Sequence, residues 1–154
     1  MMGFYSAKKE QWTKQNVCEA AAIYGLDGTL WASSDKWKGL SEYSHDVEDS
    51  DGSATTVNVN EFAIAEKVST GNRNASQAGV RMGNQKYIFT TYDEGIANLS
   101  RLGGGGGVII RTSKAIVIGI WDKEAKMSNN LNQNQGDCLI GCERVAKFMK
   151  AASF

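Results

Sequence analysis

The sequence predicts an α+β fold, with a central antiparallel sheet and helices at the two ends of the chain. The main evidence is a pair of β-branched, apolar runs, residues 108–110 and 116–121, joined by a short polar link as in a hairpin of two buried strands. The composition agrees, because 154 residues with 42% hydrophobic and 22% charged residues suffice for one globular domain, residues 1–154, with a single core.

Five consecutive glycines, residues 103–107, precede this hairpin. A phosphate-binding loop would need a helix after the glycines, usually opened by Gly-Lys-Ser/Thr, and here a strand follows instead. We therefore favour a flexible or bulged strand edge, where missing side chains admit a close approach of backbone.

The N-terminal half contains helix, hairpin and loop signals in turn. Ser6 is a suitable cap for a helix over residues 6–16. Strands are expected at 20–24 and 30–33, joined at Asp27-Gly28, a dipeptide typical of tight hairpins. Residues 41–53 hold five acids and no Lys or Arg, which predicts an exposed acidic loop.

A short helix should follow this loop, opened by Asn58 or Asn60 and ending near Gly71. The C-terminal half is then mostly strand. Beyond the hairpin described above, strands are expected at 79–82, 86–92 and 96–102. A long Asn/Gln-rich link at 129–135 leads to a last helix, with Asp137 near its N-terminus and the helix ending near residue 152.

Several kinds of chemistry find no support in the sequence. There are no paired carboxylates, no catalytic triad and no phosphate loop at usable spacing, so no enzymatic activity and no cofactor are expected. One histidine, His45, and three cysteines are too sparse for a zinc site. Cys138 and Cys142 lie one helical turn apart and are interpreted as small core residues. Nothing local favours a Cys-His nucleophile pair.

The charge distribution limits the choice of partner. The net charge is zero, which argues against nucleic acid as the main ligand. Residues 1–76 carry a net charge of −4 and residues 77–154 a net charge of +4. The basic half suits an acidic protein surface or anionic lipid headgroups, and the alternative is a mixed, solvated surface. The first residues lack the apolar stretch of a signal peptide, so a cytoplasmic location is expected.

Aromatic residues at the ends of the chain are the main functional indication. Tyr5 lies near the first helix, Trp31 follows the Asp-Gly turn, and Phe148 and Phe154 belong to the last helix. Each ring alone could be ordinary core. Together they would form a patch suited to proline-rich segments, whose polyproline II helix is stiff before binding and offers carbonyls to donors such as an indole N–H.

At this point the chain resembles the profilins, a family of small actin-monomer-binding proteins. The resemblance depends on the order and spacing of four segments, and they span most of the chain from Val17 onward. They are the Ala-rich strand and Asp-Gly-Thr-Leu-Trp-Ala-Ser turn at 20–33, the Gly-x-x-Lys-Tyr entry at 83–87, the glycine-rich hairpin continuing to Trp121-Asp122, and the helix from Gly136-Asp137-Cys138 through Glu143-Arg144 to Phe148-Met149.

The resemblance implies a sheet of about seven strands, with the N- and C-terminal helices on one face and shorter helices on the other, and no enzymatic activity. It also implies binding of monomeric actin on one face, of polyproline at the opposite end and, in many members, of phosphoinositides, within the actin cytoskeleton. The alternative is a small regulatory or scaffold domain that binds peptides or lipids without actin.

Site residues follow from the resemblance by position. The polyproline-binding positions are Tyr5, Trp31, Phe148, Met149 and Phe154. The actin-facing positions are Lys86, Arg101, Glu143 and Arg144. The candidate lipid-binding residues are Arg101, Arg111 and Lys114, which are few enough that phosphoinositide binding is expected to be weak.

Three departures from the family pattern accompany the resemblance. Tyr5 stands where the family usually has Trp, and Lys8 replaces a second aromatic of the first helix. Phe148 and Phe154 lack the hydroxyl donors that tyrosines would bring. The acidic stretch near Asp46 and the link at 126–135 are longer than usual, which resembles a divergent protozoan member.

Overall fold

The computed structural model describes residues 16–154. The predicted first helix lies outside these residues apart from Asn16, and so does Tyr5. The strands are β1 (Ala20–Gly25), β2 (Leu30–Ser33), β3 (Glu42–Glu48), β4 (Ala54–Asn60), β5 (Val80–Met82), β6 (Gln85–Asp93), β7 (Ile96–Arg101), β8 (Gly105–Arg111) and β9 (Ala115–Asp122), and the helices are α2 (Glu61–Val68) and α3 (Gln135–Ala151).

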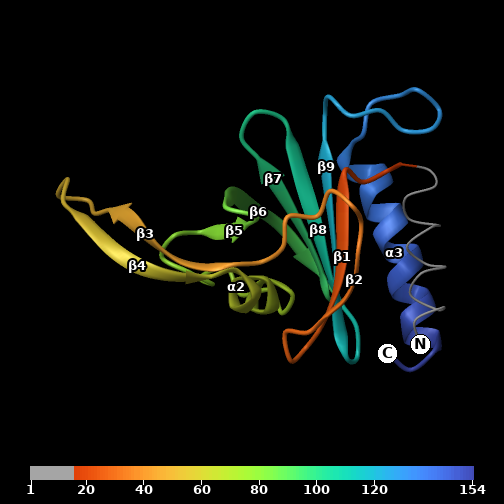
Figure 1. Cartoon of the computed structure of the whole chain (residues 1–154), viewed down its shortest axis with the longest axis horizontal. Helices are drawn as coiled ribbons and strands as arrows, with labels where there is room; N and C mark the ends of the chain where they lie inside the picture. Colours follow the sequence, from red (N-terminus) through yellow and green to blue (C-terminus); the bar gives the residue numbers. More distant parts are fainter. Residues whose placement is uncertain (1–15) are drawn as a thin grey trace.

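Seven of these strands form one antiparallel sheet, which confirms the predicted fold class. Its order is β2-β1-β9-β8-β7-β6-β5 (Figure 1). The predicted hairpin of two buried runs is the β8–β9 pair, which lies near the centre of the sheet. The Asp27-Gly28 turn joins β1 to β2, with Gly28 at a φ of 93° and the Asp27 carboxylate accepting from the Thr29 backbone N–H at 2.9 Å.

Both faces of the central strands are covered, as their continuous apolar runs require. Helix α3 packs against β8 and β9 on one face (Figure 1), over a core that includes Ile23, Ile110 and Met149. Helix α2 belongs to the core of the opposite face, where Val68 and Ile118 lie. Among the described residues, α2 is the only helix on that face, so the expectation of several shorter helices there is not confirmed.

The cap of α2 is one of the two residues predicted for it, whereas α3 begins slightly earlier than predicted. Asn60 caps α2 through its side-chain oxygen, which accepts from the Ala63 backbone N–H. Helix α3 begins at Gln135, two residues before Asp137, and Asn134 caps it. Among the described residues, no helix is both long and apolar enough to cross a membrane.

The glycine run forms a turn and then part of a strand. Gly103 and Gly104 adopt φ angles of 91° and 97°. The next three glycines belong to β8 and are buried. A Cβ atom on Gly106 would lie 2.4 Å from the Leu99 carbonyl oxygen and 2.8 Å from Trp121 Nε1. The glycines therefore admit close neighbours, as the favoured interpretation required, and no helix follows them.

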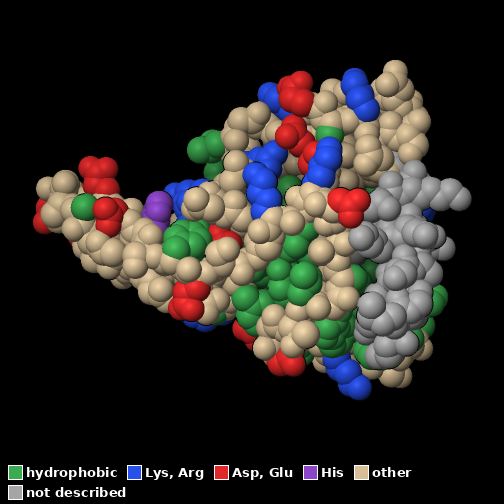
Figure 2. Space-filling view, in the orientation of Figure 1, with side chains coloured by type: hydrophobic (Ala, Val, Ile, Leu, Met, Phe, Trp, Pro, Cys, Tyr) green, Lys and Arg blue, Asp and Glu red, His purple; other side chains and the backbone are tan. Residues whose placement is uncertain are grey.

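The expectation of an acidic loop at residues 41–53 is wrong for residues 42–48, which form β3, whereas residues 49–53 make the turn that follows it. Strands β3 and β4 pair antiparallel, from Glu42 opposite Asn60 to Glu48 opposite Ala54. This two-stranded arm, residues 42–60, projects from the sheet (Figure 1). The three acids of β3 occupy one exposed face because side chains alternate along a strand, while Tyr43, His45 and Val47 on the other face are half-buried. Acidic side chains gather on it in Figure 2.

Candidate functional site

The rings of Trp31 and Phe154 meet where strand β2 lies close to the C-terminus. Their centroids are 5.9 Å apart and their planes are inclined by 83°, the edge-to-face arrangement that aromatic pairs favour. Both rings are half-buried and pack against the core under α3. Gly25 on the neighbouring strand leaves room for the indole, because a Cβ atom there would lie 2.8 Å from Trp31 Nε1.

Backbone contacts hold Phe154 in this position. Its carbonyl oxygen accepts from the Thr112 hydroxyl at 2.7 Å and from the Lys114 backbone N–H at 2.6 Å. Its own N–H donates to the Met149 carbonyl at 2.8 Å, and the Lys114 ammonium lies 5.8 Å from the centre of the Phe154 ring. The turn between β8 and β9 thus fixes the C-terminal ring. No local sequence pattern pairs Thr112 with the chain end, so this role could not be predicted from the sequence.

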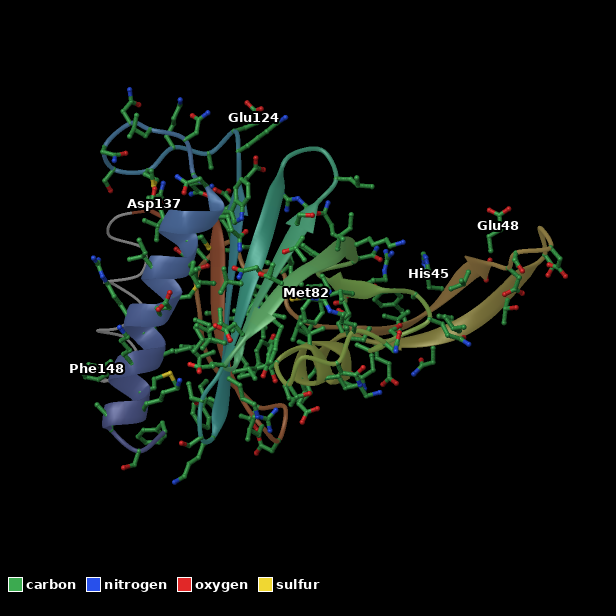
Figure 3. The ribbon with its side chains drawn as sticks, turned by 180° about the vertical axis from the view of Figure 1, so that it is seen from behind. His45, Glu48, Met82, Glu124, Asp137 and Phe148 are labelled. Atoms are coloured by element: carbon green, nitrogen blue, oxygen red, sulfur yellow. The ribbon has the colours of Figure 1, made fainter. Side chains whose placement is uncertain are left out.

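The other polyproline candidates differ in their exposure. Met149 is fully buried on the inner side of α3, so it belongs to the core against which Trp31 and Phe154 pack and offers no surface to a ligand. Phe148 is 40% exposed and points away from the sheet (Figure 3). The structure therefore brings Trp31 and Phe154 together and places Met149 in the core beneath α3, while Tyr5 lies outside the described residues.

The four actin candidates do not lie on one face. Arg101 belongs to the side opposite α3, where its guanidinium approaches the Tyr87 hydroxyl at 3.5 Å and Asp122 at 3.4 Å. Lys86 precedes the buried Tyr87 in β6, so strand alternation directs it toward the α3 side. Glu143 and Arg144 lie on α3 itself, half-buried and exposed respectively.

Arg101 also lines an open cleft of about 600 Å³. Trp37, Met82, Tyr87 and Ile120 supply apolar surface there, and Lys36 and Lys38 add positive charge. The Lys36 ammonium is 2.8 Å from Glu19, and this contact raises the Lys36 pKa. Because Glu19 and Asp122 line the same cleft, its positive charge is largely compensated.

The three lipid candidates are also separated. Arg101 pairs with Gly105 at the first residue of β8, whereas Arg111 is the last residue of that strand. Six residues of extended chain span about 20 Å. Arg111 is held by Glu66 at 3.4 Å and by the Ser69 hydroxyl at 3.1 Å. Only Lys114, in the following turn, is near Arg111 along the chain, so the structure shows no cluster of all three.

Three cysteines form a cluster of thiols. Among the described residues, no other group of His, Cys, Asp or Glu side chains has the spacing of metal ligands. The Sγ atoms of Cys18, Cys138 and Cys142 all lie within 4.8 Å of one another. Hydrogen bonds to the other two thiols, together with burial, raise the pKa of Cys138 well above its ordinary value. No local sequence pattern predicts this cluster, because Cys18 lies 120 residues from Cys138.

Comparison with known proteins identifies relatives over nearly the whole chain. The family model described as Profilin matches residues 2–154. A curated profilin of Tetrahymena pyriformis is 30% identical over 152 residues, which cover 94% of this chain and 97% of the relative.

Solved structures share the fold at lower identity. Profilin IA of Acanthamoeba castellanii has a TM-score of 0.69 at 16% identity and covers 98% of this chain and 99% of its own. LokiProfilin1 in complex with rabbit actin has a TM-score of 0.64 at 14% identity, covering 99% and 98%. Mouse profilin IIa, in complex with a double repeat from the FH1 domain of mDia1, has a TM-score of 0.59 at 12% identity, covering 94% and 95%.

Proposed function

Because this chain belongs to the profilin family, we propose that it binds monomeric actin and, at a separate site, proline-rich segments, and that it regulates actin polymerisation in the cytoplasm. Profilins are not enzymes, in agreement with the absence of catalytic motifs from the sequence. Two similar folds were solved with a partner, one with actin and one with FH1 repeats, which supports both parts of the proposal.

The contact between Trp31 and Phe154 is the observation that carries the polyproline part. Two rings held at a fixed inclination present apolar surface without a further loss of side-chain freedom. A polyproline II helix is likewise stiff before it binds, so docking the two surfaces costs little entropy. Trp31 adds an indole N–H, whereas Phe148 and Phe154 bring no hydroxyl, so we expect weaker binding than in profilins with tyrosines at those positions.

Retention on immobilised polyproline and calorimetry with a proline-rich peptide test this site. Trp31→Ala should weaken binding about 30-fold, equivalent to about 2 kcal/mol for a central aromatic anchor. Salt should have little effect, because the proposed contacts involve no charge pairs. Trp37→Phe is the matched control, since Trp37 packs on the opposite face and donates to the Tyr24 hydroxyl at 3.0 Å. Undiminished binding by a folded Trp31→Ala protein would refute the assignment.

For actin, we propose a surface on the α3 side of the sheet that includes Lys86, Glu143 and Arg144. Charges at the rim of an interface mainly steer association, so their effect should decrease with salt. Reversing Lys86 and Arg144 together to Glu should weaken capture of monomeric actin and leave polyproline retention unchanged.

The variant Arg101→Glu tests whether Arg101, which the resemblance places among the actin-facing positions, contributes to actin binding. Arg101 lies on the other face of the sheet, so we expect a smaller loss of actin binding than for the Lys86 and Arg144 pair. A larger loss from Arg101→Glu, with the circular dichroism spectrum preserved, would place actin on the opposite face. Loss of polyproline binding in any of these variants would show that the two sites are not separate.

We also propose that phosphoinositide binding is weak. Each Lys or Arg close to an anionic surface contributes about 1 kcal/mol, so strong binding needs several of them in one place. The separation of Arg101 from Arg111 and Lys114 argues against such a cluster. Co-sedimentation with phosphoinositide vesicles should be detectable at low salt and small at physiological salt, where the screening length is about 8 Å. Strong capture at physiological salt would contradict this proposal.

A further inference from the structure

Three buried thiols converge between the segment that precedes β1 and the first half of α3. The Sγ atoms of Cys18 and Cys138 are 2.9 Å apart, and Cys142, one helical turn further along α3, completes a triangle with no side above 4.8 Å. The exposed fractions of Cys18, Cys138 and Cys142 are 6%, 0% and 0%. In Figure 1, β1, β9 and α3 lie next to one another in this part of the molecule.

Gly119 of β9 provides the space in which the sulfurs meet. A Cβ atom at this position would lie 2.3 Å from Cys142 Sγ, 3.0 Å from Cys18 Sγ and 3.1 Å from Cys138 Sγ. The glycine is flanked by Ile118 and Ile120 in the buried part of β9, whose other residues from Ala115 to Ile120 are all apolar. A β-branched residue, which the rest of this strand favours, would exclude the thiols from their positions.

We propose that Cys18, Cys138 and Cys142 form a three-sulfur site for a single Cu⁺ ion. Three thiolates are soft ligands, and soft ligands select Cu⁺ and Zn²⁺ over harder cations. Metal–sulfur bonds of about 2.3 Å around one centre place ligand sulfurs roughly 4 Å apart. No side of the triangle exceeds 4.8 Å, but the Cys18–Cys138 side, at 2.9 Å, has to lengthen by about 1 Å when the metal binds.

The number of donors favours copper over zinc. Structural zinc sites are almost always four-coordinate. Within the described residues, no further His, Cys, Asp or Glu joins the three thiols at ligand spacing. Three thiolate ligands are sufficient for Cu⁺. The surrounding apolar core, which includes Val17, Val117 and Val145, excludes water from the site.

Binding involves no change of oxidation state. The S–H bonds of coordinating thiols break, Cu–S bonds form and the protons pass to the buffer, while copper remains Cu⁺. The metal would connect the segment entering β1 to α3 across 120 residues of sequence. Because the three ligands are brought together only in the folded chain, binding should raise the melting temperature.

The test is an anaerobic titration of the reduced full-length chain with Cu⁺, using bicinchoninate as a coloured competing chelator. We expect the protein to remove one equivalent of copper from the chelator and to show one copper per chain in native mass spectrometry. A thiolate-to-copper absorption band in the ultraviolet should appear with the same stoichiometry. Each single Cys→Ala variant should lose affinity by more than about 100-fold, since loss even of an outer-shell partner costs 10- to 100-fold.

Two further variants separate metal binding from core packing. Gly119→Ala keeps all three thiols but places a methyl group among them, so it should also lose copper. Met127→Leu is the matched control, because it removes another buried sulfur from the same core cluster and should retain full affinity. A count of three free thiols in denaturant checks that each preparation with an intact cluster was reduced.

Three results would overturn the proposal. The first is failure of the folded, reduced wild-type chain to compete with bicinchoninate, which would leave the cysteines as core residues alone. The second is unchanged copper affinity in folded Gly119→Ala or in two of the cysteine variants. The third is binding of Zn²⁺ without any copper binding, which would indicate a fourth ligand.

Discussion

The β3–β4 arm and the seven-stranded sheet are both antiparallel β-structure, but they are stabilised by different interactions. In the sheet, β8 and β9 are buried on both faces, and Ile109 and Ile118 lie opposite each other with no exposed surface. In the arm, one face is exposed along its whole length. The sheet is thus stabilised mainly by apolar burial, whereas the arm has little apolar area to bury.

A buried carboxylate at the base of the arm replaces the missing core. Glu61, the first residue of α2, has no exposed surface. One of its oxygens accepts from the backbone N–H groups of Ser41 at 2.9 Å and Gly83 at 3.1 Å. The other accepts from the Tyr43 hydroxyl at 2.7 Å and the Asn84 N–H at 2.9 Å. Glu61 therefore connects the arm to the turn between β5 and β6.

The largest effect should come from a cavity in the sheet. Ile118→Ala removes a side chain that is completely buried, and we expect a loss of about 4 kcal/mol in the free energy of unfolding. Val47→Ala is the counterpart in the arm, where the side chain is half-buried, and should cost less than about 1 kcal/mol. Urea denaturation measures both values. Equal losses would show that the arm depends on apolar packing as much as the sheet does.

The next effect should come from the anchor of the arm. Glu61→Ala leaves four donors without their acceptor, and we expect a loss of about 3 kcal/mol, because buried unsatisfied groups cost about 1–3 kcal/mol each and some will regain water. Glu61→Gln keeps the shape and should lose less, since one oxygen still accepts.

Hydrogen exchange distinguishes this anchor from an ordinary core residue. In Glu61→Ala, amides of the arm should exchange faster than amides of β8 and β9, beyond the effect of lower global stability. In Ile118→Ala, protection should fall in the sheet as well. Uniform loss of protection in Glu61→Ala would mean that the arm and the sheet unfold as one unit.

The sheet was predictable because its signals are local. The apolar runs at 108–110 and 116–121 and the Asp27-Gly28 turn each define a structure within a few residues. The arm carried a similar signal at Asp51-Gly52, where Gly52 adopts a φ of 86°. Its acidic composition outweighed that signal and led to the expectation of a loop. Polar and apolar residues also alternate toward the end of β4 (Ala54–Asn60), and this alternation was a second sequence signal for a strand.

The candidate site was predictable only in part, since it depends on contacts between distant segments. The sequence indicated Trp31 and Phe154 as partners, and their rings meet. It could not show that Arg101, the last residue of β7, lies beside the first residue of β8, far from Arg111 at the other end, because that separation depends on strand register. Likewise, the burial of Glu61 and the approach of Cys18 to α3 require contacts with residues far away in the chain, which no local pattern encodes.

A smaller effect should appear at alkaline pH, at one tyrosine in each region. Burial is the main cause that raises the pKa of both Tyr43 and Tyr87, and the nearby Arg81 and Arg101 oppose it. Above about pH 10 the unfolded chain releases these phenolic protons while the folded chain retains them. The stabilisation is therefore complete below that pH and is lost as the pH rises through the raised values in the folded state.

Substituting each tyrosine by phenylalanine shows how much of the stability lost at alkaline pH comes from the arm and how much from the sheet. Urea midpoints between pH 9 and 11 should fall less steeply in Tyr87→Phe than in the wild type. In Tyr43→Phe, the change should be confined mainly to exchange of the arm amides, since the Tyr43 hydroxyl bonds to the anchor. Identical pH slopes in the wild type and both variants would exclude a contribution from these phenols.

The smallest effect should come from the exposed face of the arm. The Thr56 hydroxyl donates to Asp46 at 2.6 Å from the directly opposite position, and both side chains are exposed. Because water can replace this bond in either state, Asp46→Asn should change the free energy of unfolding by less than about 0.5 kcal/mol. Thr56→Val removes the donor and keeps a β-branched shape, so it is the matched control and should be equally mild. A loss above about 1 kcal/mol in either variant, measured by urea denaturation, would mean that the arm is stabilised by its own outer face. Glu61 would then position an arm that is already stable, instead of supplying the main interaction that holds it.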